Sequence, residues 1–186
     1  GENINTIADR ATFEGTSVIE QIDGACTMFE RYYSVETIEG ARRTTHYSIP
    51  YEAFREAVAN AVAHRTWDVN AKIRIAMHPD CIEISSPGGL PAGLGRDEYL
   101  RGFISQLRNP ILANVLFRLN IIEMFGTGIV RIRSSYAEYE QKPEFDVSEN
   151  AVRVTLPVTD ARPALTSDEE LVYRFIKEEG PTASGQ

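Results

Sequence analysis

The stretch from Arg55 to Arg65, which reads REAVANAVAHR, constrains the fold more than any other part of this sequence. At about 100° per residue in an α-helix, Glu56, Asn60 and His64 fall at roughly 0°, 40° and 80°. The apolar positions occupy roughly 100° to 240° on the same wheel; they are Phe54, Ala57, Val58, Ala61 and Val62. The sequence therefore predicts a helix over about 51–65 that packs one face and holds a carboxylate, an amide and an imidazole along its edge.

Two glycine turns follow this helix in order. Pro87-Gly88-Gly89 comes at the end of an apolar, alternating segment, where backbone can approach a ligand closely. Gly126-Thr127-Gly128 precedes a helical pattern, and the free N–H groups and dipole of a helix N-terminus favour a phosphate. A plain tight turn is the alternative interpretation of either segment.

Periodicity elsewhere indicates an α/β protein. A helix is predicted over 18–33 with Thr16 or Ser17 as its cap, and a hairpin is predicted from the alternation in 73–77 and 82–84. Further helices are expected over 110–119, capped by Asn109 and ended by a left-handed Asn120, over 129–139 and over 168–179. An extended segment at 43–49 and a strand at 152–156 complete the pattern. Helices on one face of a mixed sheet, an α/β sandwich, are the fold this predicts.

Composition excludes several classes of protein. The 186 residues carry a formal net charge of −8, which argues against a broad nucleic-acid surface on this chain. No apolar run approaches the roughly 18 residues of a membrane span, and no P-loop motif is present. The two cysteines, Cys26 and Cys81, lie far apart, so no zinc cluster follows from local spacing and reduced thiols in a cytoplasm are expected.

The order of these motifs resembles the GHKL, or Bergerat-fold, ATPases. The finer similarity is to a divergent branch in transcriptional regulators, related to the C-terminus of the DNA helicase RecG and usually found with an AlbA- or Schlafen-type DNA-binding domain. It covers roughly residues 50–157 and is carried by four ordered blocks: residues 54–65, 82–91, 108–110 and 122–129. The resemblance implies a two-layer α/β sandwich of Bergerat type.

The resemblance also implies roles for particular residues. Glu56 is expected to act as the base for the attacking water, and Asn60 as a ligand of Mg²⁺. The nucleotide would contact both glycine turns and the segment between them, which gives these expected binding residues: Asn60, Ser86, Gly88, Gly89, Arg108, Gly126, Thr127 and Gly128. From the residues alone, Glu56 and Asn60 fit the solvent edge of an ordinary amphipathic helix equally well, and Arg108 fits a surface arginine.

The sequence departs from the working ATPases at two points. Ser85 and Ser86 stand where those enzymes have an Asp that accepts a hydrogen bond from the adenine amino group, although the divergent branch generally lacks this Asp too. After His64 and Arg65, Thr66-Trp67 replaces the usual Asp and aromatic residue. The first departure leaves the preference for adenine open, and the second leaves open how His64 or Arg65 is oriented.

The resemblance therefore implies a nucleotide-binding regulatory module with ATP and Mg²⁺ as cofactors and weak or no hydrolysis, so that enzyme activity, as a Mg-dependent ATPase, stays open. The alternative is a degenerate scaffold for dimerisation or partner binding. DNA would be contacted by flanking domains, and no membrane partner is expected.

Three segments are expected along the chain. Residues 1–49 form a linker from an upstream domain with a packing helix and strand, and residues 50–158 form the ATPase-like domain. Residues 159–186 form a linker and the start of a further module, with the winged helix as one possibility.

Overall fold

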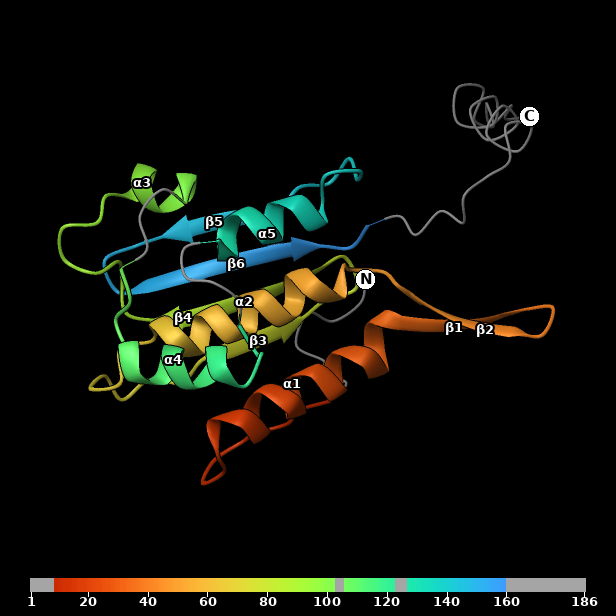
Figure 1. The fold of residues 1–186 in the computed structure, drawn as a ribbon, viewed down its shortest axis with the longest axis horizontal. Coiled ribbons are helices and arrows are strands. Elements are labelled where there is room, and N and C mark those ends of the chain that lie inside the picture. Colours follow the sequence, from red (N-terminus) through yellow and green to blue (C-terminus); the bar gives the residue numbers. More distant parts are fainter. Residues whose placement is uncertain (1–8, 103–105, 123–126, 160–186) are drawn as a thin grey trace, which may run out of the picture.

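A layer of helices covers one face of a four-stranded sheet in the computed structural model, which describes residues 9–102, 106–122 and 127–159 (Figure 1). The strand order is β3 (Arg74–Met77), β4 (Cys81–Pro87), β6 (Ala151–Pro157) and β5 (Glu144–Val147). This arrangement confirms the predicted α/β sandwich. The expected mixed pairing is wrong for the described strands, because β3–β4, β4–β6 and β5–β6 are all antiparallel.

The two faces of the sheet differ in chemistry. On β4, Ile82, Ile84 and Ser86 are buried, whereas Glu83 between them is half-buried and lies 3.9 Å from Arg153 of β6 in an ion pair. Because successive side chains of a strand point to opposite faces, one face of the sheet packs on the helices and the other presents polar groups.

Helix α2 (Tyr51–His64) is the central element of the helical layer, as predicted. It lies over β4 and β6, with α1 (Val18–Tyr33), α4 (Pro110–Arg118) and α5 (Gly128–Ser135) around it (Figure 1). Neighbours on several sides explain why α2 buries more than the apolar stripe that was expected, Glu56 included.

Helix α1 begins where the sequence indicates. Ser17 and Glu20 form a capping box, in which each side chain accepts a hydrogen bond from the other residue's backbone N–H. Phe29 is fully buried and stacks on Phe54 of α2 with ring centroids 4.3 Å apart, so α1 packs on the central helix.

A second, two-stranded sheet is formed by β1 (Ser34–Glu39) and β2 (Arg42–Tyr47), and it projects from the body of the protein (Figure 1). The sequence predicted the turn at Gly40 and an extended segment at 43–49, but not β1. Strand β5 was also not predicted, since both strands are short and only partly buried.

The region between β4 and β6 contains α3 (Arg96–Arg101), α4 and α5. Asn120 adopts the predicted left-handed conformation with φ 56°. Helix α5 ends at Ser135, before the expected residue 139; Tyr136 is fully buried there and its hydroxyl donates to the carbonyl oxygen of Pro157 at 2.9 Å.

Two further predictions have a limited test. The helix expected over 168–179 lies outside the described residues, and the proposed domain boundaries stay predictions. In the part of the chain that is described, no helix combines the length and apolar character that crossing a membrane requires.

Candidate functional site

Glu56 and Asn60 of α2 are brought together as the helical spacing predicted. The Asn60 side-chain amide donates from Nδ2 to Glu56 Oε1 at 3.0 Å. The other carboxylate oxygen, Oε2, lies 3.7 Å from Nε of Arg131 on α5. Glu56 is only 7% exposed, and a buried carboxylate requires such partners because burial removes its hydration. The alternative interpretation, in which Glu56 lies on the solvent edge of an ordinary amphipathic helix, does not hold for Glu56, because α5 covers it.

Gly128, the first residue of α5, lies directly against this pair. A Cβ atom added to Gly128 would stand 2.3 Å from Asn60 Nδ2 and 2.8 Å from Glu56 Oε1, closer than carbon can approach either atom. The close contact of α2 with α5 thus favours glycine at this position, because a side chain there would displace the ends of Asn60 and Glu56. Thr127 precedes it, and Gly126 lies outside the described residues.

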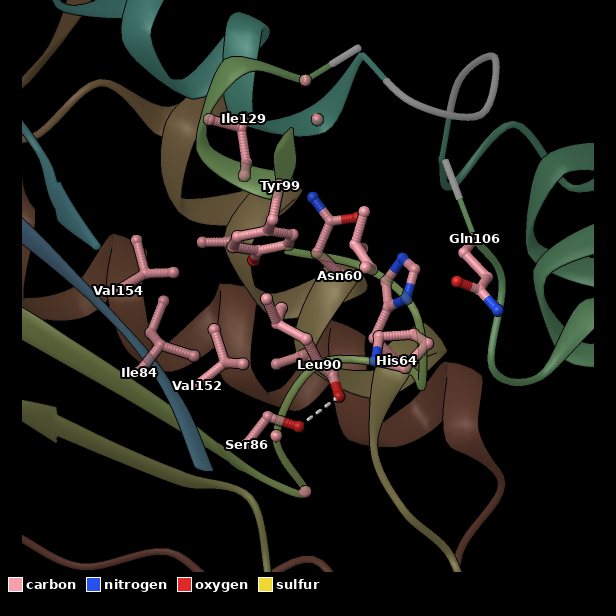
Figure 2. Close-up of a pocket in the computed structure, with 18 residues that line it drawn as sticks. Asn60, His64, Ile84, Ser86, Leu90, Tyr99, Gln106, Ile129, Val152 and Val154 are labelled. Atoms are coloured by element: carbon pink, nitrogen blue, oxygen red, sulfur yellow. Dashed lines mark hydrogen bonds between the residues drawn. The ribbon is translucent and has the colours of Figure 1, made fainter. Parts of the chain in front are cut away.

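A cavity lies between α2, the sheet and the segment that carries α3 (Figure 2). Its volume is about 90 Å³, which leaves room for several water molecules. Asn60 and His64 line it from α2, Ile84 and Ser86 from β4, and Val152 and Val154 from β6. The lining is mainly aliphatic, with polar groups at a few points, which is the usual character of a small-molecule site.

Ser86 occupies the position of the missing Asp, at the end of β4. Its hydroxyl is buried and donates to the carbonyl oxygen of Ala61 on α2 at 2.8 Å (Figure 2). This bond ties the strand to the central helix. Because a hydroxyl oxygen has two lone pairs, Ser86 Oγ keeps the capacity to accept a hydrogen bond from a group in the cavity.

His64 and Tyr99 add two titratable groups to the cavity lining. Burial, with a smaller contribution from the positive charge of Arg108, lowers the pKa of His64 below 6.5, so its imidazole is neutral at pH 7. Burial raises the pKa of the Tyr99 hydroxyl to about 12. The ring of Tyr99 lies beside Asn60 in the close-up (Figure 2).

The glycines of the Pro87-Gly88-Gly89 loop pack against protein. Gly88 has φ +98°, and a Cβ on it would meet the hydroxyl of Thr66 and the guanidinium of Arg108. A Cβ on Gly89 would stand 2.4 Å from the carbonyl oxygen of Glu149. Both glycines also line the cavity, so the residues that pack closely against protein are also the ones that a ligand in the cavity would contact.

Arg108 is placed beside the cavity but is not among its lining residues. Its guanidinium donates to the carbonyl oxygen of Gly89 at 2.7 Å and to the hydroxyl of Thr66. Thr66, which stands at one of the sequence departures, thus has a structural partner. In the described structure these two hydrogen bonds from Arg108 stabilise the glycine loop. The expected contact of Arg108 with phosphate stays a prediction.

Asn109 holds the C-terminal end of α2. Its Nδ2 donates to the carbonyl oxygens of Ala63 and Arg65, at 2.9 and 2.8 Å. Asn109 stands at the N-cap position of α4, as predicted, but its side chain makes no cap bond there. The preference of asparagine for N-cap positions predicted where Asn109 lies on α4. Its contact with α2 could not be predicted from neighbouring residues, because the partners are more than 40 positions apart in sequence.

Several cavity residues were not identified from the sequence as site residues. Leu90, Pro91, Leu94, Tyr99 and Gln106 come from the segment between the glycine turns. Trp67 and Tyr99 were both interpreted as packing residues. Trp67 stacks under the guanidinium of Arg65 at 4.4 Å, whereas Tyr99 lies at the cavity. The raised pKa and the cavity, neither visible in the sequence, are what distinguish the two.

The described residues contain no group of three or more His, Cys, Asp or Glu side chains able to hold a metal ion. Asn60 is the residue suited to a shared site, since Mg²⁺ is often held by one or two protein oxygens together with waters and phosphate oxygens. With Nδ2 donating to Glu56, Oδ1 is the coordinating atom that Asn60 offers at the cavity. Cys26 and Cys81 are free thiols.

The fold is an α/β sandwich with a cavity beside α2, and comparisons with known proteins indicate which domains it resembles. Residues 70–156 match the family described as "Putative ATP-dependent DNA helicase recG C-terminal". This match confirms the resemblance to the RecG C-terminal-like, ATPase-like domains. The matched residues begin after α2, so Glu56 and Asn60 precede them.

The structure is also similar to the crystal structure of the DIP2311 protein from Corynebacterium diphtheriae, with a TM-score of 0.66 and 26% sequence identity. The similarity covers 77% of this chain and 30% of that chain, so the chain spans under a third of that protein's length. No curated protein matches the sequence.

Gly128→Ala tests the close contact of α2 with α5. Because the methyl group would collide with Asn60 and Glu56, we expect a loss of about 1–3 kcal/mol in the free energy of unfolding, measured by urea denaturation. Gly95→Ala is the matched control, since a Cβ there meets Glu98 at an ordinary 3.4 Å. Equal stability of the two variants would contradict the described contact.

His64→Gln tests the burial of the imidazole. Because the folded state lowers the pKa of His64 below 6.5, the unfolded chain binds more protons as the pH falls through that value. His64 therefore lowers stability below about pH 6.5 and leaves it unaffected above that range. We expect the free energy of unfolding, measured by urea denaturation between about pH 7.5 and 5, to fall less with falling pH in the variant than in the parent. The same change at exposed His46 is the control, and an unaltered decline in His64→Gln would refute the assignment.

Proposed function

We propose that this domain binds an adenine nucleotide with Mg²⁺ as the regulatory module of a transcriptional regulator, with weak or no hydrolysis. The observation that carries the proposal is the cavity beside the Glu56–Asn60 pair, in a domain whose family is described as ATP-dependent. Contact with DNA is assigned to flanking domains, in keeping with the net charge of −8.

The inner part of the cavity suits a planar base. Ile84, Val152 and Val154 form an aliphatic wall from the sheet, and Ser86 lies at its end. A purine ring buried against such a wall gains from the removal of apolar surface from water. The Ser86 oxygen would accept the hydrogen bond that an Asp accepts in the working ATPases, directly or through a water molecule. A neutral acceptor favours modest affinity.

The phosphate side of the cavity suits a nucleotide with its cation. Asn60 offers its amide oxygen to Mg²⁺, and Thr127 and Gly128 stand at the start of α5, where helix N–H groups favour an anion. When bound, Mg²⁺ would neutralise part of the phosphate charge. The residues present therefore fit the nucleotide and the cation, and Gly126 is included in the site as a prediction.

A second candidate is a scaffold for dimerisation or partner binding without nucleotide. One observation favours it: Gly88, Gly89 and Arg108, three of the residues expected to contact nucleotide, make close contacts with protein. Under this hypothesis the glycines are retained for packing, and the replacement of Asp by Ser86 records the loss of nucleotide binding.

Calorimetric titration with ATP, ADP and a non-hydrolysable analogue, with and without Mg²⁺, separates the two functions. Asn60→Ala should weaken Mg²⁺-dependent binding about tenfold or more, equivalent to roughly 1.4 kcal/mol, because the coordinating oxygen is lost. Asn114→Ala, at an exposed position of α4, is the matched control and should bind as the parent does.

Flat titrations of the folded parent protein would reject nucleotide binding and favour the scaffold. Binding that is equally strong in Asn60→Ala and Asn114→Ala would reject the assigned Mg²⁺ ligand while leaving the cavity as the site.

A further inference from the structure

Arg131 connects α5 to the carboxylate that is expected to serve as base. It lies one turn after Gly128, and its Nε is 3.7 Å from Glu56 Oε2. The Arg131 side chain is 29% exposed and that of Glu56 is 9% exposed. An ion pair this far removed from solvent is screened by salt much less than a surface pair, so the attraction between Arg131 and Glu56 persists in salt.

Both oxygens of Glu56 therefore face a partner. Oε1 accepts the Asn60 amide, and Oε2 faces the guanidinium of Arg131. A general base must reach the proton that it removes, within hydrogen-bond distance of the water or through one further water. Each carboxylate oxygen keeps a further lone pair, so a water that approaches Glu56 does so beside the Arg131 guanidinium.

The consequence concerns hydrolysis. In that reaction the oxygen of water forms a bond to the terminal phosphorus, the bond from that phosphorus to the leaving oxygen of ADP breaks, and the water proton passes to the base. A positive guanidinium beside the base opposes this proton transfer, because it stabilises the ionised carboxylate relative to the protonated one.

We propose that Arg131 is a positioning residue that orients Glu56 and weakens it as a base, which keeps hydrolysis of bound nucleotide slow. This inference rests on the proposed nucleotide-binding function and concerns the regulation of the same site. A change that draws Arg131 away from Glu56, such as a displacement of α5 by a flanking domain, would raise turnover. The rate of nucleotide hydrolysis would then depend on the position of α5 relative to α2.

The test compares turnover with binding in the same variants. Arg131→Gln removes the charge, and we expect kcat for Mg-ATP to rise about tenfold or more, with the calorimetric Kd within about twofold of the parent. Arg131→Lys restores the charge and should return kcat toward the parent value. Arg118→Gln, at an exposed position on α4, is the control. The gain in Arg131→Gln should disappear in the Glu56→Gln double variant.

Each other outcome overturns the proposal. Nucleotide binding with unchanged or reduced kcat in Arg131→Gln would reject this inference and leave the proposed function intact. Absence of binding in the parent would reject both. If Arg131→Gln does not fold, Arg131→Met, which keeps the aliphatic stem, replaces it. Failure of both to fold, with Arg131→Lys folded, would assign Arg131 to stability and reject the regulatory role.

Discussion

The contact of α2 with α5 at Gly128 is the constraint on which the arrangement of this domain depends. Without a side chain at Gly128, the two helices approach until the backbone of α5 meets Asn60 and Glu56. This approach buries Glu56 and brings Arg131 to its second oxygen. It also fixes the edge of the cavity, since Gly128 and Ile129 line the cavity together with Asn60. A single glycine therefore influences packing, electrostatics and access at once.

The elements with strong local signals could be predicted from the sequence. The candidate caps Thr16 and Ser17 indicated the start of α1, and the apolar alternation in 73–77 and 82–84 indicated the β3–β4 hairpin. Helix α2 was evident because its apolar spacing is regular and its length is sufficient. Asn120 was identified as left-handed because asparagine tolerates that conformation better than most residues.

Features set by distant contacts could not be predicted. The burial of Glu56 depends on α5, and the bonds of Asn109 to the end of α2 join residues far apart in sequence. The same holds for Arg108, whose partners Thr66 and Gly89 come from different loops. Strands β1 and β5 were missed because exposed and half-buried positions give weak alternation. Of the residues expected to contact nucleotide, Asn60, Ser86, Gly88, Gly89 and Gly128 line the cavity, whereas Arg108 and Thr127 are not among its lining residues.

The cavity provides the main link between the fold and its proposed function. Its aliphatic wall comes from β4 and β6, its polar edge from α2, and its cover from the segment of α3. Ser86 contributes to both the fold and the site: its hydroxyl stabilises the contact of β4 with α2, and its oxygen is a neutral acceptor for a ligand. These features support the proposed binding of a nucleotide in the cavity.

An NMR titration of the isotope-labelled protein with a non-hydrolysable ATP analogue and Mg²⁺ tests the central claim most directly. If the cavity is the nucleotide site, the largest shifts will fall on the amides of Asn60, Ser86, Tyr99 and Gly128, with small shifts on the β1–β2 hairpin. Shifts that cluster away from the cavity, or none at saturating analogue, would contradict the account.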